Sequence, residues 1–489
     1  TSRESESTSS HYRGFPSGEY HSPNYAAEIK DKPSKSQSTS RLAGFLFLAN
    51  YTWNDIYLAD VSVRFDGSSE FGLDQKWAPF WSFGAGVNLH NYAFLHGSKV
   101  INRMKFRASY GQTGKVNFPS YSARTVYRTF DRWYIAGFGV GLKALGNRDL
   151  KWETTNKLNV GTDMEFWNSR ISLIFDYYYN KTVDLITDVT LPGSAGFSSY
   201  KSNLGETLNK GFDIQFRFDV MKNKDWNVAL WGNLNHNRNE ILKISDALKA
   251  YNSQVDDYYE LAEEDQTSNS SWVKANKTYS DFIKPIMKYE EGASLNTIYG
   301  MKSLGINPAN GKEVYQRRNG TITQEWEAAE QQPIGDADPW ANGSFGFDVR
   351  YKGFYVNTAF RYEFGGDTYN HTLASNVENA NVSQYNVDKR VMTDRWQKID
   401  DVTPLKALQD RYYITRPTSR FVQKNNFVTF QSLTVGYDFD PQLIARFGLK
   451  TLSLQFNMED IATISTVKRE MGLSYPFART FNFKLTTSF

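Results

Sequence analysis

Apolar and polar residues alternate along most of this chain from Arg41 onward. In one such segment Ile171, Leu173 and Phe175 share a side, whereas Asp176 lies on the other. A repeat of two residues is typical of a β-strand, in which successive side chains point to opposite faces. The pattern predicts thirteen strands, which begin near Leu42, Ile56, Phe80, Met104, Leu158, Ile171, Phe212, Trp226, Phe345, Phe354, Phe427, Leu452 and Phe481.

Two all-β architectures use such strands, and they differ in what covers the apolar face. In a soluble sandwich a second sheet covers it, whereas in an outer-membrane barrel it meets lipid and the polar face lines a lumen. Aromatic residues such as Trp53, Tyr179 and Phe364 stand at predicted strand ends, where the girdles of membrane barrels lie. We therefore predict an all-β fold, a transmembrane antiparallel β-barrel.

The predicted connections alternate between short and long, as in bacterial barrels with periplasmic turns and extracellular loops. Three long polar loops occupy 113–150, 239–341 and 365–425. If the C-terminus is periplasmic, an odd count of thirteen strands means that the first strand also begins outside. Thirteen strands cannot close an even-stranded barrel, so we expect the remaining strands to come from another chain or from a removed N-terminal part.

Residues 1–40 differ from the rest of the chain because they are rich in Ser, Lys and Glu. Such a segment buries too little apolar surface to offset its ordering entropy. We expect a mobile polar extracellular loop, or the N-terminus of a cleaved or split chain. Residues 41–489 are then a partial barrel with the long extracellular loops.

Composition removes several function classes. The chain has no cysteine, which excludes a disulfide framework and cysteine nucleophiles. Its 56 Lys and Arg nearly balance 53 Asp and Glu, and nucleic-acid binding would need clustered excess basic charge. Mean hydropathy is −0.57, and no apolar run reaches the roughly 18 residues of a membrane helix.

Three segments resemble motifs of the SusC-like TonB-dependent transporters. Residues 64–72 read RFDGSSEFG, residues 106–114 read FRASYGQTG, and residues 146–153 read GNRDLKWE. In the last of these, Arg148 stands where the family usually has proline. The aromatic C-terminal strand is also similar, and the segments occur in the family's order along the chain.

The resemblance implies the C-terminal part of a 22-stranded barrel, with nine strands and the N-terminal plug absent from this chain. It implies an outer-membrane nutrient importer that takes up oligosaccharides or oligopeptides with a SusD-like surface lipoprotein as lid. Energy would come from the TonB complex, and the plug with the first strands would be a separate chain. No enzymatic activity and no cofactor are expected.

Aromatic side chains in the long loops are the ligand-binding candidates, because their faces stack on sugar rings and pack on peptide side chains. The alternative is that they pack the loops or the lipoprotein. The candidates are Tyr127, Trp133, Tyr134, Trp272, Trp326 and Tyr369.

The first motif has a simple structural interpretation, since Asp, Gly and Ser form tight turns. We expect a structural role for Arg64, Asp66, Gly67, Ser68, Ser69, Phe71 and Gly72. The resemblance further implies that Phe489, the last residue, belongs to a signal read by the barrel-insertion machinery.

Metal sites receive little support. Six acidic residues between Asp256 and Asp265 offer oxygen ligands for calcium but lack the spacing of a calcium loop, so a solvated helix is favoured. His90 and His96 fall in one predicted periplasmic connection, and their spacing does not suit a metal site.

Two other functions use similar strands. A passive porin-like channel has no plug, and a soluble glycan-binding β-sandwich buries its apolar faces. The choice between oligosaccharide and oligopeptide stays open at this point, because aromatic loops of mixed charge suit both.

Overall fold

The computed structural model describes residues 2–488 apart from several internal segments. The segments outside the described part are 17–21, 31–33, 72–75, 116–122, 132–137, 145, 148–149, 191–198, 204, 268–282, 381, 383–385, 409–413 and 469–478.

Fourteen strands form one antiparallel sheet, which we call the wall. Neighbours in the wall follow chain order, so each connection joins adjacent strands. In spatial order the strands are β1 (Ser2–Ser9), β4 (Ser34–Trp53), β5 (Tyr57–Ser68), β6 (Trp77–Asn88), β7 (Ile101–Lys115), β10 (Glu153–Phe166), β11 (Ile171–Val183), β14 (Glu206–Lys222), β15 (Trp226–Lys243), β21 (Ala341–Tyr351), β22 (Phe354–Tyr369), β23 (Val422–Asp438), β24 (Thr451–Ser465) and β25 (Phe481–Ser488).

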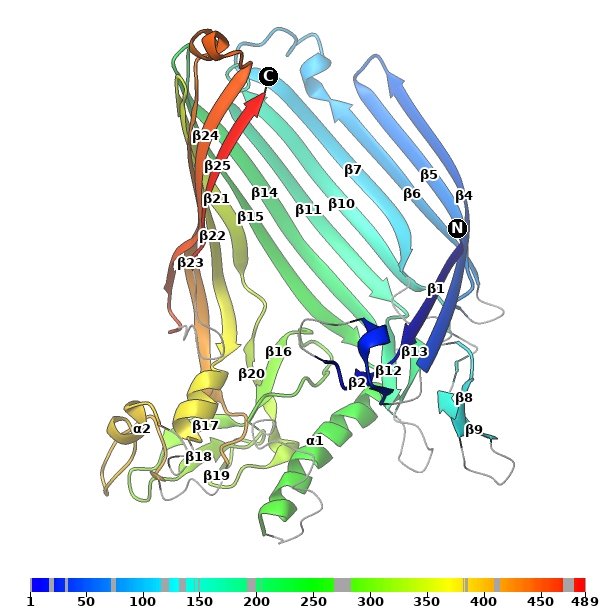
Figure 1. Ribbon diagram of the computed structural model, residues 1–489, viewed down its shortest axis with the longest axis vertical. Coiled ribbons are helices and arrows are strands. Elements are labelled where there is room, and N and C mark those ends of the chain that lie inside the picture. Colours follow the sequence, from blue (N-terminus) through cyan, green and yellow to red (C-terminus); the bar gives the residue numbers. More distant parts are fainter. Residues whose placement is uncertain are drawn as a thin grey trace.

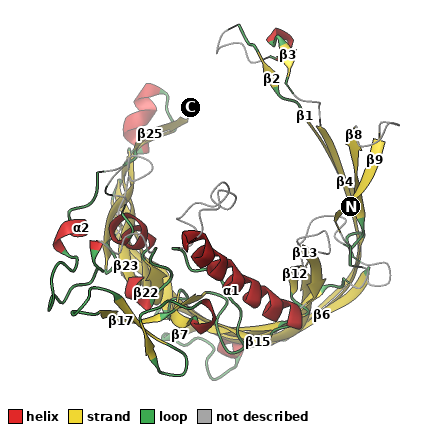
Figure 2. Ribbon diagram, turned by 90° about the horizontal axis from the view of Figure 1, so that it is seen from below, coloured by secondary structure: helices red, strands yellow, loops and turns green. Residues whose placement is uncertain are grey.

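The wall curves into an open half-barrel, which Figure 2 shows from one end. Within the described residues, β25 pairs only with β24, and residues 42–53 of β4 pair only with β5. The two edges lie far apart across the opening. Both edges therefore present unpaired backbone donors and acceptors along strands that are rich in apolar residues.

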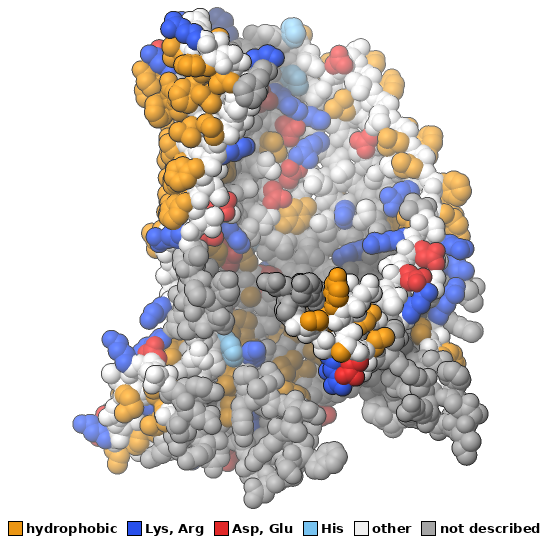
Figure 3. Space-filling model, in the orientation of Figure 1, with side chains coloured by type: hydrophobic (Ala, Val, Ile, Leu, Met, Phe, Trp, Pro, Cys, Tyr) orange, Lys and Arg blue, Asp and Glu red, His pale blue; other side chains and the backbone are white. Residues whose placement is uncertain are grey.

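Opposite faces of the wall differ in chemistry. Cross-strand pairs such as Phe47 with Val63, and Phe456 with Phe483, carry apolar side chains on the outer face. Hydrophobic side chains gather along the outer flank in Figure 3, whereas charged side chains line the hollow. The predicted all-β class is confirmed. The soluble sandwich is wrong, because no second sheet covers the outer face in the part of the chain that the structure describes.

All thirteen predicted strands are present in the wall, and β1 is an additional one. The expectation of a mobile loop over residues 1–40 is wrong for β1, which pairs with residues 34–41 of β4. This polar ribbon has no apolar face to reveal it in the sequence. Its backbone ladder and polar contacts stabilise it, including Lys35 Nζ at 2.7 Å from Glu6 Oε1 and Gln37 Nε2 at 2.6 Å from Glu4 Oε1.

The short connections gather at one end of the wall, which we call the turn end, and the long ones at the other, the loop end (Figure 1). Asn54 and Asp55 turn from β4 to β5 with φ of 51° and 56°, as a two-residue hairpin turn requires. Two of the connections at the turn end contain short helices. One holds η2 (Leu89–Asn91), and the other holds α3 (Pro441–Ile444) with η9 (Ala445–Phe447). The predicted alternation of short and long connections holds for most of the wall, but the loop-end connection 69–76 is shorter than the turn-end connections 89–100 and 439–450.

Two long connections fold together at the loop end (Figure 1). They are residues 244–340, between β15 and β21, and residues 370–421, between β22 and β23, and we call them the loop-end subdomain. Its elements are α1 (Asp246–Thr267), β16 (Thr297–Gly300), β17 (Lys302–Ile306), β18 (Glu313–Gln316), β19 (Ile322–Thr323), η5 (Ala328–Glu330), β20 (Gln332–Asp336), η6 (Leu373–Glu378), α2 (Arg390–Thr393) and η8 (Ser419–Phe421).

Outside both the wall and the loop-end subdomain, the described residues form three small hairpins. They are β2 (Tyr12–Arg13) with β3 (Glu28–Ile29), β8 (Val126–Asp131) with β9 (Phe138–Ala144), and β12 (Ile186–Thr190) with β13 (Ser199–Asn203). One further helical turn is η1 (Pro23–Tyr25). Among the helices of the described ranges, none has the length and apolar content that crossing a bilayer requires.

Candidate functional site

Charged side chains on the inner face of the wall occur in pairs. Arg107 Nη2 lies 2.6 Å from Asp176 Oδ2, and its Nε lies 3.3 Å from Asp163 Oδ1. These residues stand on three consecutive strands, β7, β10 and β11, so the pairs cross the ladder. Arg107 is therefore neutralised by carboxylates of the next two strands.

An open cavity of about 610 Å³ lies on the inner face, toward the turn end. Arg217, Trp231, Asp348, Arg350 and Tyr355 are among its lining residues. Its two arginines are already paired, Arg217 with Asp348 at 3.4 Å and Arg350 with Asp438 at 3.0 Å. The cavity therefore offers a polar and nearly neutral surface, with two aromatic rings and two amides, rather than an anion site.

The loop-end subdomain has a core of its own. Tyr259, Met301 and Tyr315 are buried with Trp326, which is 8% exposed. Trp326 Nε1 donates to the Pro417 carbonyl at 2.9 Å. The two connections thus share one core, because Pro417 belongs to the second of them and the other residues to the first.

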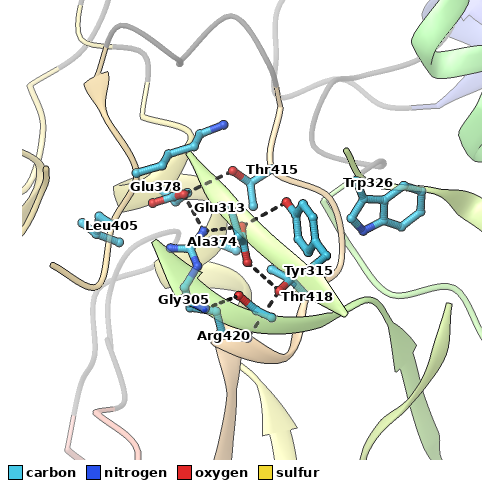
Figure 4. Close-up of polar contacts among 12 residues, drawn as sticks. Gly305, Glu313, Tyr315, Trp326, Ala374, Glu378, Leu405, Thr415, Thr418 and Arg420 are labelled. Atoms are coloured by element: carbon cyan, nitrogen blue, oxygen red, sulfur yellow. Dashed lines mark hydrogen bonds and ion pairs between the residues drawn. The ribbon is translucent and has the colours of Figure 1, made fainter. Parts of the chain in front are cut away.

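A buried ion cluster joins the same two connections, and we call it the Arg420 clasp (Figure 4). Arg420 Nη2 lies 2.7 Å from Glu313 Oε2 and 2.7 Å from Glu378 Oε1. Thr418 Oγ1 donates to Glu313 Oε1 at 2.7 Å, and Thr415 Oγ1 donates to Glu378 Oε1 at 3.2 Å. Glu313 comes from β18, Glu378 from η6 and Arg420 from η8, so the clasp binds three separate segments.

The electrostatics of the clasp follow from its burial. The side chains of Glu313 and Glu378 are 3% and 0% exposed, and that of Arg420 is 10% exposed. Burial opposes ionisation of Glu313, but Arg420 and the Thr418 hydroxyl outweigh it, so the pKa of Glu313 lies below its ordinary value. Burial also opposes the charge on Arg420, and the two carboxylates outweigh it, so the pKa of Arg420 is raised. Glu313 and Arg420 are therefore both charged at neutral pH.

A second buried arginine stabilises the backbone that carries Glu378 of the clasp. Arg395 is 3% exposed, and its guanidinium donates to the carbonyls of Val377 at 2.8 Å and Glu378 at 2.9 Å. It also donates to the carbonyls of Val391 and Lys406, both at 3.0 Å. Arg395 therefore fixes the backbone at the end of η6, from which Glu378 reaches Arg420.

The loop aromatics predicted to bind ligand do not form one surface. Trp326 is buried in the subdomain core, and Tyr369 packs against Phe421 at a centroid distance of 6.0 Å. For these two the packing alternative is the one that the structure favours. Tyr127, on β8, is 63% exposed and stays a prediction. Trp133, Tyr134 and Trp272 lie outside the described residues.

The first family motif packs at the loop end of β5. Phe71, 2% exposed, stacks on Trp152 of the third motif with centroids 4.3 Å apart. Asp66 is buried and receives Arg64 Nε at 2.5 Å. These contacts favour the structural role that the sequence predicts.

The remaining motif residues also make turn and packing contacts. Ser69 Oγ accepts the Arg41 N–H at 2.9 Å, and Ser68 Oγ accepts the Glu70 N–H at 3.2 Å. A Cβ on Gly67 would come within 2.6 Å of the Trp77 ring, so this position requires glycine. Gly72 and the C-terminal Phe489 lie outside the described residues.

The acidic segment forms part of α1 rather than a calcium loop. Asp256 Oδ1 lies 2.8 Å from the ammonium group of Lys288, whose side chain is 5% exposed. Among the described residues, no three His, Asp or Glu side chains converge as metal ligands would. His90 Nδ1 instead lies 3.2 Å from the Met104 carbonyl.

Sequence reasoning missed the clasp completely. Arg420 is 107 positions from Glu313 and 42 positions from Glu378. The three residues stand in three distant segments of the chain, so no local signal could have paired them.

Comparison with known proteins gives a consistent result. The family model described as TonB dependent receptor-like, beta-barrel matches residues 3–380. TonB-dependent receptor P3 of Formosa agariphila is 28% identical over an alignment of 487 residues, which covers 94% of this chain and 46% of the relative. TonB-dependent receptor SusC of Bacteroides thetaiotaomicron is 26% identical, over 76% of this chain and 36% of the relative.

The fold comparison agrees. The structure of the RagAB peptide transporter matches with a TM-score of 0.76 at 23% identity, over 93% of this chain and 48% of that chain. At this identity the likeness concerns the fold. This chain spans about half the length of the relatives that it matches.

Proposed function

This chain belongs to the TonB-dependent receptor-like β-barrel family, and we propose from that premise that it serves in energy-dependent nutrient import. Members of the family are outer-membrane transporters, and the predicted outer-membrane location and barrel class are confirmed. The proposed cargo is an oligosaccharide or an oligopeptide. We assign the turn end to the periplasm and the loop end to the cell exterior, following the usual arrangement of bacterial barrels.

The contrast between the two faces of the wall supports this proposal most directly. Apolar side chains cover the outer face, where lipid would meet them, and paired charges line the inner face. A surface of paired charges and amides stays hydrated while cargo passes, because each arginine is already neutralised by a carboxylate. Soluble monomeric proteins rarely expose an apolar surface of this extent to water.

Additional strands complete the barrel in this proposal. Each unpaired backbone group in a bilayer costs several kcal/mol, so a membrane sheet must have no open edge. Residues 42–53 of β4 and all of β25 are such edges in the described part of the chain. We propose that further strands pair with both, together with a plug that fills the hollow, supplied by a separate chain or by the same one.

A surface lipoprotein lid is the second part of the proposal. SusC and RagAB, which this chain resembles in sequence and fold respectively, motivate a SusD-like partner. On the loop-end subdomain, Met392, Ile399 and Val402 are 57%, 66% and 87% exposed. Apolar side chains that are this exposed at the predicted extracellular end are suited to contact with another protein.

Energy dependence separates this proposal from a passive channel. Uptake of labelled oligopeptides and oligosaccharides should be measured in cells with and without TonB, and with the proton-motive force collapsed. Loss of uptake of one cargo class in both conditions supports the proposal and identifies the class. Uptake that continues unchanged would favour the porin-like alternative.

A further inference from the structure

The connection between β6 and β7 folds against the outer face of the wall. Tyr92, in this connection, has its hydroxyl 2.6 Å from that of Tyr57, and the two rings meet edge to face at 6.2 Å. Tyr57 in turn stacks on Trp53 with centroids 5.5 Å apart. Tyr57 shares its side of β5 with Val63, so it belongs to the lipid-facing side. We call residues 89–100 the turn-end link.

Side-chain amides fix the turn-end link to the neighbouring hairpin. Asn88 Nδ2 and Asn91 Nδ2 donate to the same carbonyl, that of Asp55, at 2.7 and 2.8 Å. The Asn88 N–H donates to the Ile56 carbonyl at 2.7 Å. Asn91 thus ties the link itself to the hairpin, and Asn88, the last residue of β6, ties the strand end from which the link begins.

The link satisfies much of its own backbone. The N–H groups of Tyr92, Leu95 and His96 donate to carbonyls within the link, at 2.8 to 3.1 Å. Ser98 Oγ accepts the N–H groups of Val100 and Ile101 at 3.3 and 3.1 Å. Backbone groups that are bonded internally can enter the membrane boundary at low cost.

Apolar side chains on this internally bonded link are exposed. Phe94 is 75% exposed and Val100 is 47% exposed. The Phe94 ring lies 5.7 Å from that of Tyr92, so Trp53, Tyr57, Tyr92 and Phe94 form one continuous aromatic row. Lys99 is exposed on the same link. Aromatic rings with flanking basic groups suit the boundary between lipid headgroups and acyl chains.

We propose that the turn-end link is a membrane anchor, which places Phe94 at the headgroup boundary of the adjoining leaflet. Its occupant is lipid, because the aromatic row continues the lipid-facing side of the wall without a break. The assignment to the periplasmic leaflet rests on the proposed function, whereas the contact with lipid rests only on the barrel fold. The link would fix the depth of β6 and β7 in the bilayer.

This chain has no cysteine, so single-cysteine labels give a direct test once any cysteine in the remainder of the transporter has been replaced. Phe94→Cys, carrying an environment-sensitive fluorophore, is placed in the complete transporter in phosphatidylcholine liposomes. A quencher attached near the lipid headgroup should reduce its fluorescence more strongly than a water-soluble quencher does. His96→Cys on the same link is the matched control, and there we expect the opposite order.

Two outcomes would overturn the proposal. Equal quenching of the two labels by the aqueous reagent would place Phe94 in water, and protection of Phe94→Cys from both quenchers would indicate a protein contact. Should Phe94→Cys fail to assemble, Val100→Cys tests the same boundary. The readout needs an assembled barrel but no transport, so its failure is distinguishable from failure of the import proposal.

Discussion

The wall and the loop-end subdomain use the same kinds of charged residues in opposite ways. In the wall, Arg217 and Asp348 pair with side chains 48% and 36% exposed. In the subdomain, Arg420 and Glu378 pair with side chains 10% and 0% exposed. An exposed pair contributes at most about 1 kcal/mol, whereas breaking a buried pair from one side costs about 3–5 kcal/mol. The wall therefore depends on its backbone ladder, and the subdomain on a few specific side chains.

Removing the central cation should give the largest effect. Arg420→Met leaves the buried carboxylates of Glu313 and Glu378 without the cation that they share, at a cost of about 3–5 kcal/mol. We expect faster amide hydrogen exchange in β17, β18 and η6, and unchanged exchange in β10 and β11. Mass spectrometry of the detergent-solubilised protein measures both regions in one sample.

A compensated variant serves as the control for this change. Combining Arg420→Met with Glu313→Gln and Glu378→Gln removes all three charges, so no uncompensated charge stays buried. Much of the protection should return. If Arg420→Met instead accelerated exchange equally in the wall, the two regions would not be energetically separate.

An aromatic contact at the junction of two motifs should rank second, where Trp152 Nε1 also donates to the Lys76 carbonyl at 3.4 Å. Trp152 stacks on Phe71 and meets Phe80 edge-on at 5.4 Å. Trp152→Ala should lower the free energy of unfolding by about 3 kcal/mol, because it leaves a cavity. Thermal unfolding in detergent measures the loss. Trp167→Ala, at a half-exposed turn position, is the matched control and should change stability far less.

Acid should loosen the subdomain before the wall. The pKa of Glu313 is lowered in the folded protein, chiefly by Arg420 acting against burial. Its stabilisation is therefore complete above the ordinary glutamate pKa of about 4.3, and is lost as the pH falls through the lower folded value. Hydrogen exchange of β18, compared between neutral and acidic pH at matched intrinsic rates, should show this loss.

Glu313→Gln isolates the contribution of that carboxyl group. In this variant, exchange in β18 should be faster at neutral pH and should change less on acidification. An unchanged acid response would show that another group controls the subdomain.

The smallest effect belongs to the inner face of the wall. Asp348→Asn should change the free energy of unfolding by less than about 1 kcal/mol, because solvent screens the pair with Arg217. Thermal unfolding at low and high salt measures it. A loss comparable to that of Arg420→Met would break the comparison between the two regions.

Sequence could predict the wall because strand alternation is a local signal. In segments such as Ile171–Val183, the alternation of apolar and polar residues shows which face of the sheet each side chain occupies. All thirteen strands predicted in this way are present in the wall. The polar strand β1 was missed, since Ser and Glu alternation carries no apolar face. Its pairing with β4 depends on the backbone ladder and on partners about 30 residues away, for which propensity gives little guidance.

The candidate site was less predictable, again for a physical reason. Aromatic loop residues have two competing uses, and burial decides between them. For Trp326 the partner is the Pro417 carbonyl, which lies 91 positions away. Packing of that kind depends on how two loops meet in space, and neither loop encodes it alone.

The subdomain enters and leaves the wall through four adjacent strands, β15, β21, β22 and β23. Because these strands are adjacent, the subdomain is a contiguous unit that evolution can exchange as a whole. The two connections can diverge together, with the clasp as the shared constraint, while the ladder of the other strands is left untouched. One barrel scaffold can therefore acquire new recognition surfaces by exchange of a contiguous sector, and its membrane-embedded residues need not change.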